Sequence, residues 1–144
     1  RIYGLEYTIV RPSAVYGPRD VVDRVLSKFV VRAKNGDPMR INGAGLKLDF
    51  SVVDEIADGI ILAATKLGGV NETFNITRGL ERPLYEAANI INDILGTKTP
   101  VIVEENDGKY PKRGALDITK ARTLLGFDPK VNIEEGLKYY IDSL

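Results

Sequence analysis

The chain has 144 residues, the length of one ordinary domain, and its 20 basic residues balance its 20 acidic residues. A balanced charge gives no field that favours nucleic acid or an anionic membrane surface, and no apolar run approaches the roughly 18 residues that span a bilayer. Because the chain has no histidine and no cysteine, thiolate nucleophiles, Ser–His relays and zinc held by those residues are excluded.

The first predicted strand is Tyr7–Val10, an apolar and partly β-branched run that is typical of a buried strand. We expect it to stop at Arg11-Pro12, because proline removes a backbone donor from the sheet. A strand that ends in a polar, basic loop is where open α/β sheets place their ligands. The stretch that begins at Tyr7 and ends at Asp20 is therefore the first candidate for a binding site.

Helical and strand-like segments alternate along the rest of the chain. Apolar residues at helical spacing predict helices over Val21–Lys34, Asp54–Leu67, Pro83–Leu95 and Thr119–Leu125, and a last helix that begins at Asn132. Short apolar runs predict strands over Met39–Asn42, Leu48–Val53, Thr73–Ile76 and Pro100–Val103. Glycines follow the first four helices, as is common at helix C-termini, and Glu104–Gly114 is expected to be a polar loop.

Two helix starts have capping signals. Asp54 is expected to cap the second helix, and Asn132 with Glu135 forms the pattern of a capping box.

The alternation of elements predicts the α/β class. Only Tyr7–Val10 and Thr73–Ile76 have the character of central parallel strands, and a lone strand cannot satisfy its backbone groups. We therefore expect part of the surface that this fold packs against to lie outside the chain. The first residue, Arg1, is not methionine, which favours a segment of something longer.

Gly43-Ala44-Gly45 begins like a dinucleotide-binding fingerprint, but Leu48 stands where the third glycine would be. A strand, not a helix, is expected to follow, so no helix N-terminus is available for a pyrophosphate. We interpret these glycines as a tight loop.

Seven motifs in order resemble the extended short-chain dehydrogenases/reductases, the NAD-dependent nucleotide-sugar epimerases and dehydratases. The first, Gly4–Pro12, is similar to the family's strand just after the catalytic helix. It runs into Arg-Pro-x-x-Val-Tyr-Gly-Pro-Arg over residues 11–19, which is similar to the loop that closes over nicotinamide and sugar. The other six are Ile41–Gly45, Leu48–Glu55, Phe74–Ile76, Asp117–Arg122, Leu125–Pro129 and Glu134–Leu137. The resemblance implies the last strands of a Rossmann-type parallel sheet plus the small C-terminal substrate-binding lobe.

The family's catalytic pair, Tyr-x-x-x-Lys, is absent, because none of the seven tyrosines has lysine four residues later. By the resemblance the chain is somewhat under half of an enzyme whose N-terminal half would hold that pair and the glycine-rich NAD loop. No catalytic residue and no metal site is expected in this segment. Residues 1–20 and 70–80 would supply sheet strands and loops, and residues 21–53 and 97–144 mainly the substrate lobe.

The resemblance also implies site residues. Arg11, Pro12 and Ser13 would contact NAD or NADP at its nicotinamide end, although Arg11 could instead only pair with a local carboxylate. A nucleotide sugar would contact Ser13, Ala14, Arg19, Arg40, Ile41, Asn42, Lys47 and Arg113.

Within that set the expected roles differ. Ser13 and Ala14 would approach the sugar diphosphate, residues 40–42 would lie along the base and ribose, and Arg113 would make charge-assisted contacts with the diphosphate. The chain departs from the family where Ala14 replaces a common Asn and Leu48 replaces an Arg. Lys47 could partly substitute for that arginine as a point charge.

The expected function is the substrate-binding part of an NAD(P)-dependent epimerase/dehydratase of the UDP-glucose 4-epimerase type. Hydride would pass to and from NAD on the sugar, and the chain alone is expected to be inactive. The alternative is a non-catalytic module of the same fold that binds or regulates. We expect a cytoplasmic protein, a homodimer at full length, and neither nucleic acid nor membrane as a partner.

Overall fold

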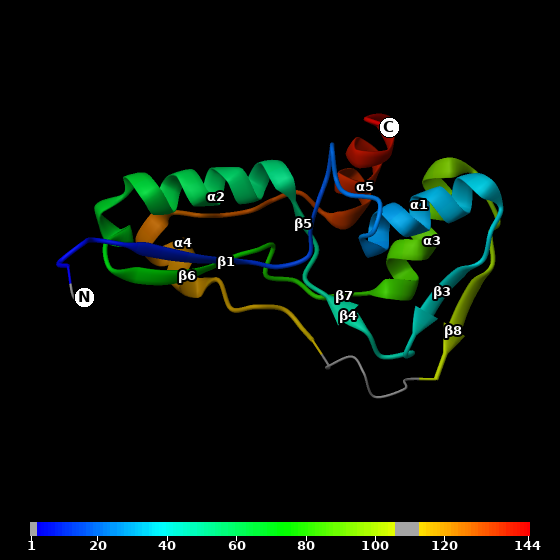
Figure 1. Ribbon diagram of the computed structural model, residues 1–144, viewed down its shortest axis with the longest axis horizontal. Helices are drawn as coiled ribbons and strands as arrows, with labels where there is room; N and C mark the ends of the chain where they lie inside the picture. The colour runs from blue at the N-terminus through cyan, green and yellow to red at the C-terminus, as the bar shows by residue number, and fades with distance from the viewer. Residues whose placement is uncertain (1–2, 106–112) are drawn as a thin grey trace.

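The computed structural model describes residues 3–105 and 113–144, in which helices alternate with short strands (Figure 1). The helices are α1 (Val25–Asn35), α2 (Val53–Thr65), α3 (Leu84–Leu95), α4 (Thr119–Leu125) and α5 (Ile133–Asp142), with a 3-10 turn, η1, at Leu67–Gly69. The strands are β1 (Thr8–Pro12), β2 (Val15–Tyr16), β3 (Met39–Asn42), β4 (Lys47–Leu48), β5 (Ser51–Val52), β6 (Glu72–Ile76), β7 (Arg82–Pro83) and β8 (Val101–Glu104).

The described strands form pairs. The pairs β1–β6, β2–β5 and β3–β8 are parallel, whereas β4–β7 is antiparallel. Parallel strands need long connections, and the helices supply them. The predicted α/β class is therefore confirmed.

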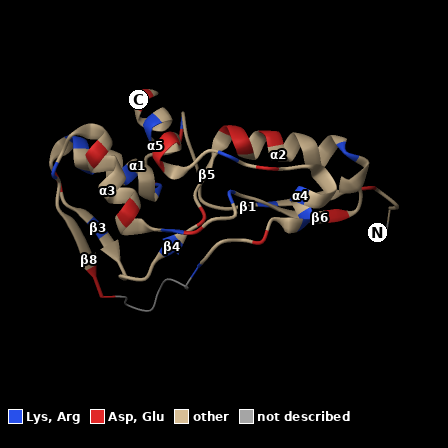
Figure 2. Ribbon diagram, turned by 180° about the vertical axis from the view of Figure 1, so that it is seen from behind, with Lys and Arg blue, Asp and Glu red and all other residues tan. Residues whose placement is uncertain are grey.

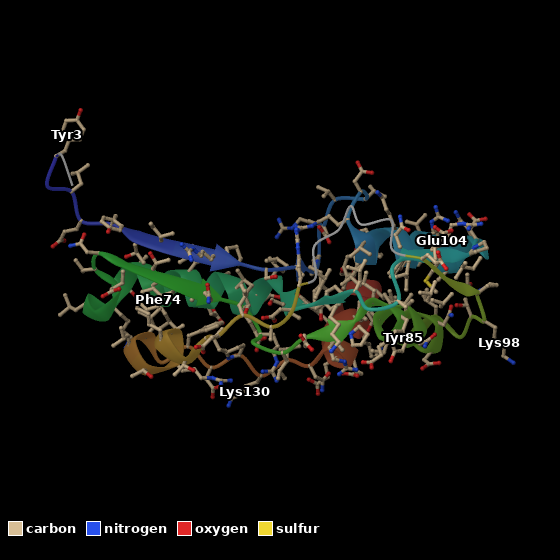
Figure 3. All side chains as sticks on the ribbon, turned by 90° about the horizontal axis from the view of Figure 1, so that it is seen from below. Tyr3, Phe74, Tyr85, Lys98, Glu104 and Lys130 are labelled. Atoms are coloured by element: carbon tan, nitrogen blue, oxygen red, sulfur yellow. The ribbon has the colours of Figure 1, made fainter. Side chains whose placement is uncertain are left out.

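The molecule is elongated, with α2, α4, β1 and β6 towards one end and α1, α3, β3 and β8 towards the other (Figure 1). Tyr3 and Lys98 lie near opposite ends of the long axis (Figure 3). The buried apolar residues form two separate clusters, one for each end. The first joins α1, α3 and α5 and includes Tyr16, and the second joins α2, β6 and α4.

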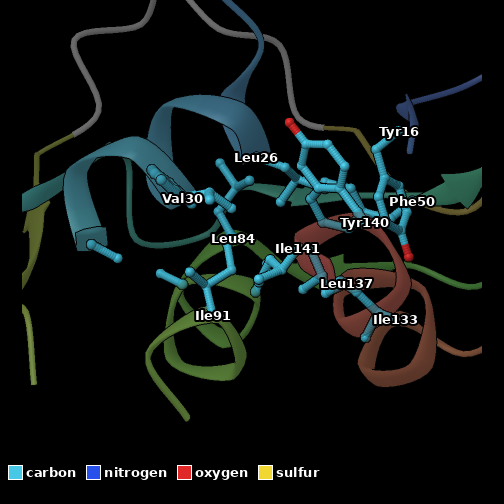
Figure 4. Packing of buried hydrophobic residues seen from close by; sticks show 14 of the residues in the cluster. Tyr16, Leu26, Val30, Phe50, Leu84, Ile91, Ile133, Leu137, Tyr140 and Ile141 are labelled. Atoms are coloured by element: carbon cyan, nitrogen blue, oxygen red, sulfur yellow. The ribbon is translucent and has the colours of Figure 1, made fainter. Parts of the chain in front are cut away.

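The larger cluster explains the apolar spacing of three helices (Figure 4). Its fully or nearly fully buried members from α1, α3 and α5 include Leu26, Val30, Leu84, Ile91 and Leu137. Tyr16 meets Phe50 and Tyr140 edge to face, with ring centroids 6.3 and 6.5 Å apart. This cluster therefore packs β2 against α5, the last helix of the chain.

Most predicted helix ends are confirmed. Gly36, Gly96 and Gly126 each adopt the left-handed conformation that ends a helix. The Asn132 side chain accepts a hydrogen bond from the Glu135 N–H at 2.7 Å, which caps α5.

The predicted cap at Asp54 is wrong, because α2 begins at Val53 directly after β5. Asp54 lies in the first turn, where its negative charge interacts favourably with the helix dipole. The first helix also begins later than expected, at Val25, and Val21 and Val22 are exposed.

Three strand predictions need correction. The first strand continues through Pro12, which pairs with Ile76, because β1 has a neighbour on one edge only among the described strands and an edge strand tolerates proline. It is also only half buried: Val10 packs against the cluster of α2, β6 and α4, whereas Ile9 is on the opposite face and is 46% exposed. The strand expected over Leu48–Val53 is split into β4 and β5. Residues 106–112 of the expected polar loop lie outside the described residues.

A close contact between α5 and β2 gives the first prediction. A Cβ on Gly136 would lie 2.1 Å from the Tyr16 Oη and 2.5 Å from Val52 Cγ2. Gly136→Ala should lower the free energy of unfolding by about 1–3 kcal/mol, since overpacking exceeds the gain in helix propensity. Urea denaturation measures this.

Gly45→Ala is the matched control, because a Cβ there meets nothing within 4 Å. Equal stability of the two variants would contradict the close packing of α5 on β2.

Candidate functional site

A hollow of about 480 Å³ lies where α1, β3 and β4 meet the start of α3. Its apolar wall consists of Val25, Phe29, Ile41, Leu46, Leu48 and Leu84. The wall residues from α1 and β3 belong to the larger buried cluster or pack against it. The buried core therefore holds this wall in place. Such a wall suits a flat, apolar group of a ligand.

The rim of this hollow is basic. Among the described residues, Lys28, Arg32, Arg40 and Arg113 line it against a single carboxylate, Asp23. Figure 2 shows basic residues on α1, β3 and β4 at this end of the molecule. An apolar wall beside a cationic rim fits a ligand with a ring at one end and a negative charge at the other.

Existing contacts hold two of these cations in place. The Arg40 Nη1 donates to Glu104 Oε1 at 2.6 Å, across the parallel pair β3–β8. The Arg32 Nη1 donates to the Pro38 carbonyl oxygen at 2.8 Å. Both side chains are therefore oriented by the fold itself.

A second hollow of about 190 Å³ adjoins the first. Val25, Leu48 and Arg113 line both, so the two hollows share a wall. The other residues around the smaller hollow come mainly from β2 and the start of α1: Ala14, Val15, Tyr16, Asp20, Arg24, Leu26 and Phe50.

Asp49 holds the segments around both hollows together. Its side chain is fully buried between β4 and β5. The carboxylate accepts hydrogen bonds from Thr77 Oγ1 at 2.7 Å, from the Gly79 N–H at 3.1 Å and from the Leu116 N–H at 3.1 Å. Buried carboxylates require such donors, because burial removes their hydration.

These bonds lie close in sequence to residues that line the hollows. Leu48, which lines both, directly precedes Asp49, and Arg113 lies three residues before Leu116. Asp49 belongs to the Leu48–Glu55 motif, but the motif alone predicted no role for it. The signal available in the sequence was an acidic residue between two apolar neighbours, which indicates a buried carboxylate.

The predicted substrate residues divide into two groups. Arg40, Ile41, Asn42 and Arg113 line the larger hollow, and Ala14 and Arg113 line the smaller one. The structure thus brings together five of the eight. Arg24 and Asp20, which the sequence analysis did not name as site residues, lie with them.

The other predicted residues lie outside the walls of both hollows. The Lys47 Nζ donates to Glu81 Oε1 at 2.6 Å, and this bond raises the pKa of Lys47. Arg19 is exposed with a positive φ of 65°. Ser13 follows the end of β1 and is half-buried.

Other kinds of site are not supported by the described residues. Within residues 3–105 and 113–144 no three acidic side chains gather to hold a metal ion. No helix in that part of the chain is long and apolar enough to cross a membrane.

The sequence is similar to that of a defined family. Residues 1–77 match the model of the NAD dependent epimerase/dehydratase family. The chain is 32% identical to UDP-glucuronic acid decarboxylase 3 of Arabidopsis thaliana, over 95% of this chain and 40% of that protein. It is 34% identical to the UDP-glucuronate 4-epimerase of Thermodesulfobacterium geofontis, over 95% and 42%.

Solved structures agree with these sequence matches. A UDP-glucose 4-epimerase from Thermotoga maritima, solved with UDP-glucose, superposes with a TM-score of 0.90 at 32% identity, over 98% of this chain and 46% of that one. An epimerase from Methanothermobacter thermautotrophicus has a TM-score of 0.91 at 27% identity, over 98% and 44%. The chain therefore spans about 40–46% of the length of these relatives.

Loss of the Asp49 carboxylate gives the second prediction. Asp49→Asn should lower the free energy of unfolding by about 1–3 kcal/mol, because its amide group would face donors that the carboxylate now satisfies. Urea denaturation measures this. Asp58→Asn, an exposed position on α2, is the control and should leave stability unchanged. A neutral Asp49→Asn would contradict the anchoring role.

The third prediction concerns Tyr16, which lies on the smaller hollow. Burial raises the pKa of the Tyr16 phenol, with further contributions from the charges of Glu55 and Glu134. The neutral phenol therefore contributes its full stabilisation at pH values below the ordinary tyrosine pKa of about 10. This contribution decreases as pH rises from that value towards the folded-state pKa, by up to about 1.4 kcal/mol per pH unit.

Stability measured at about pH 9 and pH 11 should therefore fall less for Tyr16→Phe than for the unchanged chain. Tyr3→Phe, at an exposed position, is the control and should behave like the unchanged chain. An identical fall in Tyr16→Phe would show that the phenol does not resist ionisation.

Proposed function

The chain belongs to the NAD dependent epimerase/dehydratase family, and on that premise we propose that its larger hollow binds the nucleoside diphosphate of a nucleotide sugar. The family and the α/β fold expected from the motifs are confirmed. One observation carries the proposal: the apolar wall and the basic rim gather Arg40, Ile41, Asn42 and Arg113 in one hollow.

The apolar wall receives the base. Phe29, Leu46 and Leu84 offer a surface for a flat ring, and β3 runs along one side with Asn42 at its end. Asn42 can both donate and accept hydrogen bonds, which suits the mixed edge of a pyrimidine base. Uridine diphosphate is the nucleotide in the names of several relatives, including those from Arabidopsis and Thermotoga.

Arg113 receives the diphosphate. It lines both hollows, so a charged group beside it lies between the larger and the smaller one. A guanidinium makes paired, charge-assisted hydrogen bonds with phosphate oxygens. The sugar then extends into the smaller hollow, next to Ala14.

The cofactor site is proposed at the end of β1. Arg11 and Pro12 are exposed and Ser13 is half-buried, so a cofactor held mainly by residues outside this chain can reach them. The Ser13 hydroxyl and the Arg11 guanidinium are hydrogen-bonding groups that fit a polar dinucleotide. NAD, when bound, would accept and return a hydride.

In this proposal the chain binds and orients, and it performs no turnover alone. It contains no Tyr-x-x-x-Lys pair, so no residue in it moves the hydroxyl proton in the manner of the family. Positioning of the sugar is nonetheless a large part of catalysis, worth up to about 7–11 kcal/mol in favourable cases. Epimerisation or NAD reduction by the 144 residues alone would refute this division of roles.

The fourth prediction tests the hollow by calorimetric titration. The chain should bind UDP, and Arg113→Ala should weaken that binding by about ten- to a hundredfold, since a charged hydrogen bond is worth about 1.5–3 kcal/mol. Uridine, which lacks the diphosphate, should bind the unchanged chain and Arg113→Ala with equal affinity.

Arg122→Ala on the surface of α4 is the matched control and should not change UDP affinity. No UDP binding by the unchanged chain at millimolar concentration, or an equal loss for UDP and uridine, would contradict the proposed site.

A further inference from the structure

The smaller hollow contains a carboxylate that is only partly satisfied. The Asp20 side chain is 7% exposed, although it lines the hollow. Its Oδ1 accepts a hydrogen bond from the Val21 N–H at 2.9 Å and lies 3.8 Å from the Arg24 Nη1. Its Oδ2 is buried and has no hydrogen-bond donor among the described residues.

A buried carboxylate oxygen without a donor is unfavourable, because burial removes the water that would otherwise bind it. A ligand group that donates a hydrogen bond removes that penalty. Asp20 lines the hollow of about 190 Å³, so a small rotation of its side chain would present the buried Oδ2 to a group that enters there. We therefore expect a bound ligand to donate a hydrogen bond to the Asp20 Oδ2.

The nucleotide sugar of the proposed function can supply this donor. If the diphosphate lies at Arg113, the next group of the nucleotide sugar enters the smaller hollow, which Arg113 also lines. A sugar presents several hydroxyl groups, each of which can donate a hydrogen bond. The departure at Ala14 fits the same arrangement, because its methyl group cannot hydrogen-bond and Asp20 is the carboxylate acceptor among the described residues that line this hollow.

We propose that Asp20 accepts a hydrogen bond from a hydroxyl of the sugar and thereby selects a neutral hexose over a hexuronate. This inference rests on the proposed function. A hexuronate carries a carboxylate, which cannot donate at neutral pH and would be repelled by Asp20. Arg24 does not offset this repulsion fully, since its charge already faces Asp20.

The relatives show that both choices exist in sequences of this kind. Proteins named as UDP-glucuronic acid decarboxylase and as UDP-glucose 4-epimerase are each 32% identical to the chain. Identity therefore does not distinguish the two substrate classes. We place the distinction at the Asp20 carboxylate, which shares the smaller hollow with Arg24 and with Arg113, the proposed partner of the diphosphate.

The test is a calorimetric titration of the whole chain and of Asp20→Asn with three probes: UDP, UDP-glucose and UDP-glucuronate. The unchanged chain should bind UDP-glucose at least about tenfold more tightly than UDP-glucuronate. In Asp20→Asn this preference should shrink by about tenfold, while UDP affinity stays the same. Asp142→Asn, at a distant exposed site of α5, should keep the preference.

Each outcome has a defined meaning. A preference of the unchanged chain for UDP-glucuronate, or an unaltered preference in Asp20→Asn, overturns the inference about Asp20. An equal loss for all three probes in Asp20→Asn also overturns it, since it assigns Asp20 a structural role. Absence of UDP binding by the unchanged chain instead overturns the proposed function.

A second measurement needs no variant. UDP-glucose analogues in which one hydroxyl is replaced by fluorine, an acceptor that cannot donate, are titrated against the unchanged chain. One position should lose about tenfold in affinity, which identifies the hydroxyl that donates to Asp20. Equal affinity of every analogue would overturn the inference even if Asp20→Asn failed to fold.

Discussion

The architecture of this chain depends on one buried carboxylate. Asp49 has no exposed surface, and donors from Thr77, Gly79 and Leu116 satisfy it. Thr77 and Gly79 lie just after β6 and Leu116 lies before α4, at 28, 30 and 67 positions from Asp49. A charge in the interior is tolerated only if such donors converge on it, so the carboxylate requires these segments to meet. Leu48, which lines both hollows, directly precedes this carboxylate.

The two apolar clusters explain why such a tie is needed. One cluster joins α1, α3 and α5, and the other joins α2, β6 and α4. Hydrophobic burial within each cluster is not directional and does not fix how the clusters are placed. Directional contacts do so, among them the bonds to Asp49, which tie the segment after β6 and the segment before α4 to the connection between β4 and β5.

Local sequence signals predicted much of the fold. The strand Met39–Asn42 and the helix Thr119–Leu125 have the predicted bounds, and glycines end three helices as expected. Spacing and caps are properties of neighbouring residues, so the sequence shows them directly. The split between β4 and β5 was missed because Asp49 turns inward to partners that lie 28 or more positions away.

The candidate site was predicted in part, and only through the family motifs. They indicated Arg40, Ile41, Asn42 and Arg113, which the fold brings into one hollow. Lys47 was proposed as a charge for the diphosphate, but its partner is Glu81, a contact across 34 positions that no local pattern announces. Asp20 was missed for a similar reason: its burial and its unpartnered Oδ2 exist only in the folded chain.

The most direct test of this account is a two-dimensional NMR titration of the isotopically labelled chain with UDP, which reports binding at each backbone amide. Shifts should concentrate at Arg40–Asn42, at Leu46–Leu48 and around Arg113, and the amides of β6 should change little. A more open hollow of about 490 Å³ lies between the end of α1 and Thr97–Pro100. Shifts gathered there, with none at the walls of the proposed site, would contradict the account.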